Sequence, residues 1–235
     1  MILKFYFWNI IKTDVRFNCF IVSTTVFSNQ RLSNQFLLGE QKLSVGELVS
    51  RMGAIQAQDF AMAKWALGIR IKGLTNDDVE TAYNNATFLR IHVMRPTWHF
   101  VAPEDIQWML ELTAPRIRIS LRTRDKEFGI TEDMYEKSNA TFLDILKNDN
   151  HLTREELVDC FEQKGLRTDN FKLSHYTFRA EIDGLICNGR LKNGKQTVAL
   201  LDERVPQYKK YCKEEALALL AMKYFTSHAP ATLQD

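Results

Sequence analysis

The sequence lacks an apolar run long enough to cross a membrane. Its most apolar stretches near the start, residues 5–8 and 20–22, are separated by charged side chains that include Asp14 and Arg16. A membrane-spanning helix needs roughly 20 apolar residues in succession, and the same charges fall where the apolar middle of a signal peptide would lie. We therefore expect no membrane partner, and residues 1–29 are predicted to be a leader of unknown role.

Cysteine is also scarce. The four cysteines lie far apart, form no C-x-x-C pair and have no histidine at the spacing of a metal site. A structural zinc ion needs four Cys or His ligands, grouped in closely spaced pairs. The pattern predicts reduced thiols in the cytoplasm and excludes a disulfide framework and a zinc site. Nothing in the sequence implies another cofactor.

Net charge is small as well. The chain has 31 Lys and Arg residues against 29 Asp and Glu, a formal net charge of +2 over 235 residues. Its 45% hydrophobic and 26% charged residues are typical of a soluble globular protein, and the length allows one large core or two modest ones. Any attraction to phosphate groups must therefore come from local patches.

What the sequence does contain is a set of helical patterns followed by a hairpin in residues 30–102. The predicted elements, in order, are helices over 45–53, 60–67 and 78–83 and the two arms 88–93 and 97–101 of a hairpin. Ser44 and Glu47 have the S-x-x-E spacing of a capping box, and the hairpin arms alternate with period two. Met62 and Trp65 are expected on the buried side of the second helix. Helices followed by one hairpin predict a winged helix.

The same pattern recurs in residues 150–205. The predicted elements are helices over 152–165 and 172–185 and a hairpin over 186–200. Asn193-Gly194 is a residue pair preferred in two-residue hairpin turns. This recurrence predicts a second winged helix.

Two further segments complete the predicted architecture. Residues 103–149 are expected to form connecting helices, and residues 213–235 are expected to begin a third winged helix that stays incomplete. The fold class is therefore mainly α with small β-hairpin wings, arranged as tandem winged-helix units.

The most distinctive short motif is the segment 54–59, which carries Gln56 and Gln58. Side chains two residues apart in an extended segment point the same way, so both amides can face one reactant. An amide can oppose a positive charge that develops on a reactant, and it can hold an attacking water. It cannot protonate a leaving group, which suits leaving groups that are already cationic. A plainer alternative is that the two amides cap the flanking helix ends.

The first hairpin supplies further candidates. Alternation places Trp98 and Phe100 on one face and Arg95, Thr97 and His99 on the other. Thr97 and His99 are candidate substrate-site residues because an imidazole can bind phosphate or orient a water. A structural histidine hydrogen-bonded to the backbone is the alternative.

Two groups of cations stand out against the near-neutral total. The first lies on residues 115–126, where Arg118 and Arg122 are four residues apart on one helical stripe. The second group of predicted DNA contacts lies in the second unit and comprises Lys172, His175, Arg179, Arg190, Lys192 and Lys195. A helix and a wing that both carry cations, with Arg95 from the first hairpin, predict a clamp on the backbone of double-stranded DNA that does not read base sequence. A solvated charged face is the alternative.

Four segments resemble the bacterial winged-helix DNA-binding domain family that includes the interstrand-crosslink-repair DNA glycosylases. They are residues 31–32, 54–59, 94–101 and 224–232, and the likeness runs from about Gln30 to the last residue. Family glycosylases carry a glutamine, an apolar residue and then a glutamine or aspartate, which residues 56–58 match position by position. The Thr-x-His pair at 97–99 matches as well.

The resemblance implies a DNA glycosylase that excises alkylated or crosslinked bases, with Gln56 and Gln58 as the catalytic residues. Cleavage of an N-glycosidic bond develops positive charge on the sugar, which the two amides can oppose while they hold the attacking water. A base that is already cationic, such as an N7-alkylated purine, leaves without an acid. Two other interpretations stay open on the sequence. One is a winged-helix module that binds DNA without catalysis, and the other is an inactive, truncated family member.

Overall fold

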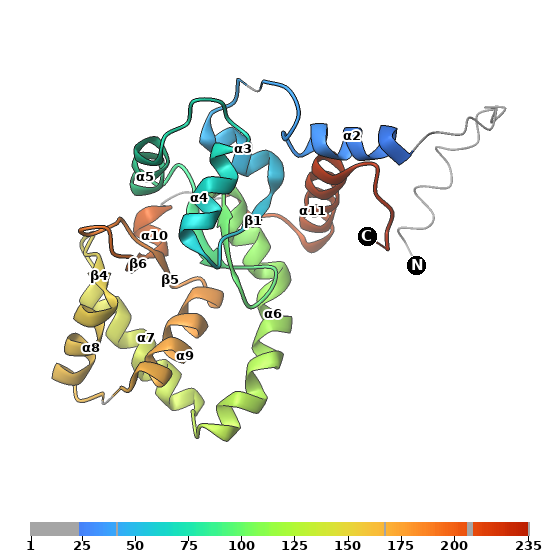
Figure 1. Cartoon of the computed structure of the whole chain (residues 1–235). Helices are drawn as coiled ribbons and strands as arrows, with labels where there is room; N and C mark the ends of the chain where they lie inside the picture. Colours follow the sequence, from blue (N-terminus) through green and yellow to red (C-terminus); the bar gives the residue numbers. More distant parts are fainter. Residues whose placement is uncertain (1–23, 41, 167, 206–208, 235) are drawn as a thin grey trace.

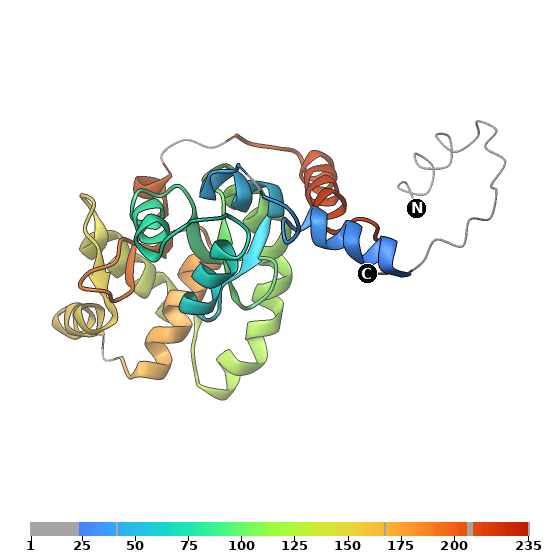
Figure 2. The ribbon, with the colours of Figure 1, turned by 45° about the horizontal axis from the view of Figure 1, so that its top comes forward.

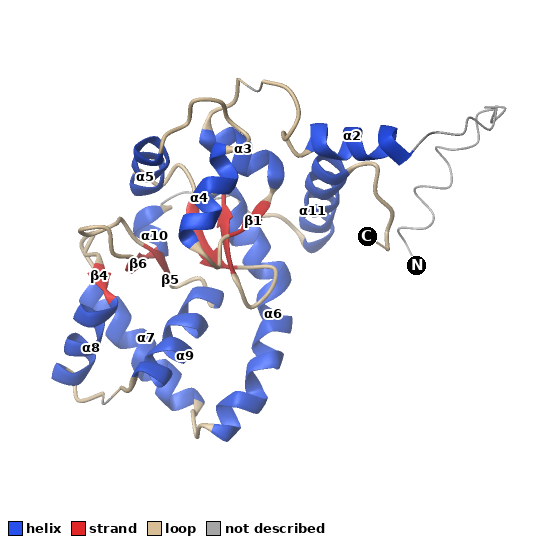
Figure 3. Ribbon diagram, viewed as in Figure 1, coloured by secondary structure: helices blue, strands red, loops and turns tan. Residues whose placement is uncertain are grey.

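The computed structural model describes residues 24–234 except 41, 167 and 206–208 (Figure 1). Most of the predicted leader lies outside these residues. Its last part belongs to helix α2 (Thr24–Asn34), which runs across the predicted boundary at residue 29. The fold is mainly helical, as expected, and has two small three-stranded antiparallel sheets where the sequence predicts two-stranded hairpins (Figure 3).

The first sheet belongs to residues 45–101, which we call the first unit. Its elements are α3 (Val45–Met52), β1 (Ala54–Gln56), α4 (Phe60–Gly68), α5 (Asn76–Asn84), β2 (Leu89–His92) and β3 (Trp98–Val101). The strand order is β1-β3-β2. The predicted capping box at Ser44 is confirmed, because its side chain accepts from the Glu47 backbone and Glu47 accepts from the Ser44 backbone.

Residues 132–200, the second unit, repeat this order of elements. They are α7 (Glu132–Leu146), β4 (Leu152–Thr153), α8 (Arg154–Gln163), α9 (Asn170–Ile182), β5 (Ile186–Asn188) and β6 (Thr197–Leu200). The strand order β4-β6-β5 matches that of the first sheet. The predicted hairpin turn is confirmed: Asn193 and Gly194 have φ angles of 52° and 75°, which this pair tolerates.

Three helices connect and flank the units. The long helix α6 (Pro103–Glu127) joins them, α10 (Leu201–Arg204) follows β6, and α11 (Lys213–His228) closes the described chain. Helix α11 contacts α2, α3 and α6, and Figure 2 shows α2 and α11 side by side at one end of the molecule. No helix among the described residues combines the length and apolar character needed to cross a membrane.

The sheet of the first unit is buried on both faces. Ile55 and Phe100 pack into a core with the helices of the first unit, whereas Ile91 and Val101 pack into a second core that includes Trp108 of α6. The sheet therefore holds its edge strands in fixed positions between two layers of helices.

The prediction that Met62 and Trp65 lie on the buried side of α4 is wrong. Ala63 and Leu67, four residues apart, are buried, whereas Met62 and Trp65 are 58% and 62% exposed. The small alanine lets α4 pack closely on its neighbours, including α5, so the larger side chains on the other face point outward.

The wing of the second unit packs against the end of α5. The Leu191 backbone N–H donates to Asn84 Oδ1 at 2.8 Å, and the Tyr83 hydroxyl donates to Gln196 Oε1 at 3.0 Å. Arg204 also donates to the Tyr83 and Asn84 carbonyl oxygens at 2.9 and 2.8 Å. The two units are therefore joined by buried and half-buried hydrogen bonds in addition to α6.

Candidate functional site

The two glutamines lie at the open end of β1, the edge strand of the first sheet. Gln56 is the last residue of β1 and is exposed, Ala57 is fully buried, and Gln58 is exposed. No described residue hydrogen-bonds the Gln56 side chain. Its amide is available to a ligand from the solvent side.

Gln58 is held by the neighbouring strand. The Trp98 backbone N–H donates to Gln58 Oε1 at 3.3 Å, while the Ala57 backbone N–H donates to the Trp98 carbonyl oxygen at 2.7 Å. Because an N–H group can donate only to the oxygen, this contact fixes the orientation of the amide. No described residue bonds the Gln58 NH₂ group or the second lone pair of its oxygen, and both remain for another partner.

Neither glutamine caps a helix. Asp59 caps α4 by accepting the Met62 backbone N–H at 3.0 Å, and the end of α3 is closed by the Gly53 N–H, which donates to backbone carbonyl oxygens. The capping alternative therefore does not describe this segment.

Arg90 of β2 secures the backbone of the glutamine segment. Its Nε donates to the Ala57 carbonyl oxygen at 2.8 Å and its Nη2 donates to the Gln58 carbonyl oxygen at 3.1 Å. The guanidinium stacks on the Trp98 ring at 4.2 Å, and Arg90 is only 6% exposed. Burial lowers the pKa of Arg90. Our sequence analysis missed this residue, although a lone arginine inside an apolar strand pattern was a usable signal.

A carboxylate from the second unit contacts the Trp98 side chain. Glu181 of α9 is fully buried and accepts the Trp98 indole N–H at 3.2 and 3.4 Å. It also accepts the His92 backbone N–H at 3.1 Å and contacts the His92 ring nitrogen Nδ1. Glu181 is 89 residues from His92, so sequence spacing gave no sign of this contact.

His99 lies opposite Gln56 in the sheet register, so the two side chains leave the sheet on the same face. His99 is only 3% exposed. Its Nδ1 donates to the Thr97 carbonyl oxygen at 2.9 Å, which leaves Nε2 as an acceptor. Burial lowers the pKa of His99 to about 4, so the ring is neutral near pH 7. The Thr97 hydroxyl is buried without a hydrogen-bond partner among the described residues.

The predicted cations of the second unit are largely neutralised. Salt bridges pair Arg179 with Glu132 and Asp183, Arg190 with Asp149, Lys192 with Glu156, and Lys195 with Glu155. His175 is only 7% exposed and lies among aromatic rings, contrary to its expected place on an open face. Lys172 is half-buried and has no ion pair among the described residues.

The cations outside the second unit are more available. Arg118 is paired with Asp183 at 2.7 Å. Arg95 and Arg122 are exposed and have no ion pair among the described residues, and the same holds for Arg116, Arg124 and Lys126. The Met94 backbone N–H donates to Thr113 Oγ1 at 3.3 Å, so the hairpin loop that carries Arg95 lies against α6 (Figure 1).

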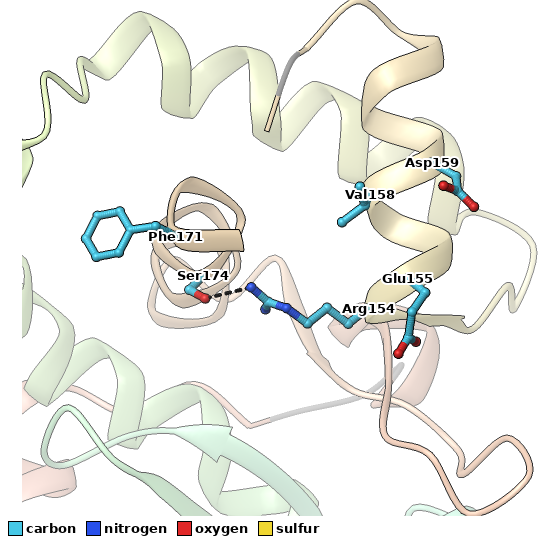
Figure 4. Close-up of a pocket in the computed structure, with 6 residues that line it drawn as sticks. All are labelled: Arg154, Glu155, Val158, Asp159, Phe171 and Ser174. Atoms are coloured by element: carbon cyan, nitrogen blue, oxygen red, sulfur yellow. Dashed lines mark hydrogen bonds between the residues drawn. The ribbon is translucent and has the colours of Figure 1, made fainter. Parts of the chain in front are cut away.

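An open hollow of about 790 Å³ lies between α8 and α9 (Figure 4). Its lining residues are Arg154, Glu155, Val158, Asp159, Phe171 and Ser174. Arg154 points across the hollow and donates to Ser174 Oγ at 2.9 Å. All lining residues belong to the second unit, so this hollow is distinct from the glutamine site.

Within the described residues, no group of three or more His, Cys, Asp or Glu side chains is placed to hold a metal ion. The arrangement at β1 offers amides, a neutral imidazole and a hydroxyl. These groups can orient a water molecule and oppose a developing positive charge without a proton donor.

Comparison with known proteins gives a consistent assignment. A structure of the DNA glycosylase AlkZ from Streptomyces sahachiroi matches with a TM-score of 0.69 and 21% identity, over 87% of this chain and 57% of that chain. This likeness shows a shared fold, and the chain spans little more than half the length of that relative. No curated protein matches the sequence. The family model described as "DNA glycosylase AlkZ-like" matches residues 49–235, and the chain therefore belongs to the AlkZ-like DNA glycosylase family.

Proposed function

We propose that this protein is a DNA glycosylase that excises alkylated or crosslinked bases from double-stranded DNA in the cytoplasm. The observation that carries the proposal is the exposed amide of Gln56 at the end of β1, which no described residue hydrogen-bonds, beside the fixed amide of Gln58. Family membership supports the reaction class, and the family pattern of glutamine, apolar residue and glutamine falls on this surface.

In the proposed reaction the base leaves with the bonding electrons of the N-glycosidic bond. An N7-alkylated purine carries a positive charge, so these electrons make it a neutral leaving group and no acid is required. Gln56 and Gln58 place amide dipoles against the cationic sugar and hold the water that attacks C1′. That water gives its proton to the solvent.

Thr97 and His99 are proposed as substrate-site residues. The neutral imidazole offers Nε2 as an acceptor on the face of the sheet that Gln56 shares. The unpartnered Thr97 hydroxyl needs a hydrogen-bond partner, because a buried hydroxyl without one costs free energy. A water molecule or a sugar oxygen is a suitable partner for each of these groups.

The architecture supports a DNA partner. We assign the first and second units as tandem winged helices, since each has three helices and a three-stranded sheet in the same order. The exposed cations on α6 and Arg95 in the adjacent loop are proposed to contact backbone phosphates, which gives binding without base readout. The clamp expected in the second unit contributes less, since carboxylates offset its charges.

Base release from a duplex that contains one N7-methylguanine tests the proposal. The protein should release free N7-methylguanine from this duplex and no base from the undamaged duplex. The double variant Gln56→Ala/Gln58→Ala, checked for an unchanged melting temperature, should bind the duplex but release no base. Binding by the unmodified protein without release would indicate a non-catalytic DNA-binding module, and absence of both would indicate an inactive family member.

A further inference from the structure

The contacts of Trp98 connect the glutamine segment to the second unit. Its backbone N–H donates to Gln58 Oε1 at 3.3 Å, whereas its indole N–H donates to the buried Glu181 carboxylate at 3.2 Å. The Arg90 guanidinium lies over the same ring and holds the Gln58 carbonyl oxygen at 3.1 Å. Trp98 is therefore fixed at both ends, by a candidate catalytic residue of the first unit and by a carboxylate of the second.

Because Glu181 is buried, loss of its contact with the Trp98 indole is costly. Glu181 is 0% exposed, and a buried carboxylate is tolerated only where donors satisfy it. The Trp98 indole and the His92 backbone are such donors, and His92 pairs with Trp98 in the sheet register. Loss of the carboxylate would release the indole and allow β3 to shift relative to the glutamine segment.

We propose that Glu181 is a positioning residue for excision, which it supports by orienting Gln58 through Trp98. The second unit then sets the geometry of a site that lies wholly in the first unit. This inference rests on the proposed function, because it gives Gln58 a part in the reaction. A misplacement of about 1 Å at a reacting group costs on the order of 100-fold in rate, so indirect support of this kind has a measurable effect.

The test compares Glu181→Ala, Glu181→Gln and Trp98→Phe with a matched control. Asp105→Asn is the control because Asp105 is also buried and also accepts an indole N–H, that of Trp108 at 3.1 Å. Two quantities are measured: hydrogen-exchange protection of the backbone amide of residue 98, and the single-turnover excision rate at saturating DNA. The first quantity reports the bond to Gln58 whether or not the protein is an enzyme.

Glu181→Ala and Trp98→Phe should each lower protection at residue 98 and slow excision by about 10-fold or more, while the Kd for DNA changes by less than about 2-fold. Glu181→Gln should give a protection at residue 98 and an excision rate between those of these two variants and those of the unmodified protein. Its amide oxygen still accepts the indole N–H but lacks the charge that strengthens the bond. The double variant Glu181→Ala/Trp98→Phe should be no slower than Glu181→Ala alone, because Glu181→Ala already removes the bond to the indole together with the contacts of Glu181 to His92. Asp105→Asn should leave protection at residue 98 and the excision rate unchanged.

Unchanged protection of residue 98 in folded Glu181→Gln and Trp98→Phe would overturn the inference, and so would multiplicative rate losses in the double variant. If Glu181→Ala does not fold, the results for Glu181→Gln and Trp98→Phe decide whether the inference holds. If the unmodified protein releases no base, the proposed function fails, and the protection measurement still shows whether Glu181 positions Gln58.

Discussion

The two units have the same order of elements, yet they differ where the first strand of each meets the next helix. In the second unit β4 ends at Thr153, α8 begins at Arg154, and Thr153 itself is the N-cap. In the first unit three residues, 57–59, separate β1 from α4, and the cap is the third of them, Asp59. The extra residues leave Gln56 and Gln58 exposed around a buried alanine.

The last register pair of each edge strand shows the same contrast. Thr153 lies opposite Thr197 in the second unit, whereas Gln56 lies opposite His99 in the first. One pair ends a strand and starts a helix, and the other places an amide beside an imidazole. The shared topology therefore does not define the site, which depends on a short linker and on the residues that fix it.

The largest expected effect is on the excision rate, which Gln56→Ala should lower and Thr153→Ala should not. Gln56→Ala should slow excision by about 100-fold, in the range seen when one preorganised polar group is lost. It should leave the melting temperature unchanged, since Gln56 is exposed and makes no hydrogen bond to a described residue. Thr153→Ala should cost about 1 kcal/mol of stability through loss of the N-cap and leave the excision rate unchanged. Single-turnover assays and thermal melts of both variants measure the contrast.

Two outcomes would contradict this division. A Gln56→Ala protein that melts early and excises normally would make Gln56 a structural residue. A Thr153→Ala protein that folds normally but excises slowly would place part of the site in the second unit.

Local features of the fold could be predicted from the sequence, because they depend on neighbours in the chain. The predicted capping box of Ser44 and Glu47 is present, and so is the predicted turn at Asn193-Gly194. The buried side of α4 could not be inferred from side-chain size, because contact with the core runs through the small Ala63. Periodicity alone does not reveal which face of a short helix a neighbour covers.

The candidate site was only partly predictable for a related reason. Exposure of Gln56 and Gln58 follows from alternation in an extended segment. Several partners of the cations in the second unit come from distant segments, such as Glu156 for Lys192, 36 residues away. A count of lysines and arginines therefore overestimated the free positive charge of the second unit.

A smaller effect should distinguish the cations of α6 from those of the second wing. Arg122→Gln should weaken duplex binding several-fold and reduce the slope of log Kd against log salt concentration by about one, as expected for one lost phosphate contact. Lys195→Gln is the matched change in the wing, where Glu155 lies 3.3 Å from the lysine. Its effect on the slope should be smaller, because the Lys195 charge is already offset.

Fluorescence anisotropy titrations from about 50 to 200 mM salt measure both slopes over the range where phosphate contacts weaken strongly. A slope for Arg122→Gln equal to that of the unmodified protein would mean that α6 is a solvated face. A larger loss for Lys195→Gln would restore the second unit as the main DNA contact.

The last prediction concerns the pH dependence of stability at the His99 pair. Burial lowers the pKa of His99 from 6.5 to about 4. Between these values the unfolded chain binds a proton at this position and the folded chain does not, so the free energy of unfolding falls as the pH drops from about 6.5 to about 4. His99→Thr, which copies Thr197 of the second unit, removes this contribution. Urea unfolding at pH 7.5 and pH 5.0 should therefore show a smaller loss of stability for the variant than for the unmodified protein. The lowered pKa values of His151 and His175 affect both proteins alike, so their contributions cancel in the difference. Equal losses of stability in the two proteins would mean that His99 takes up a proton while the protein is folded.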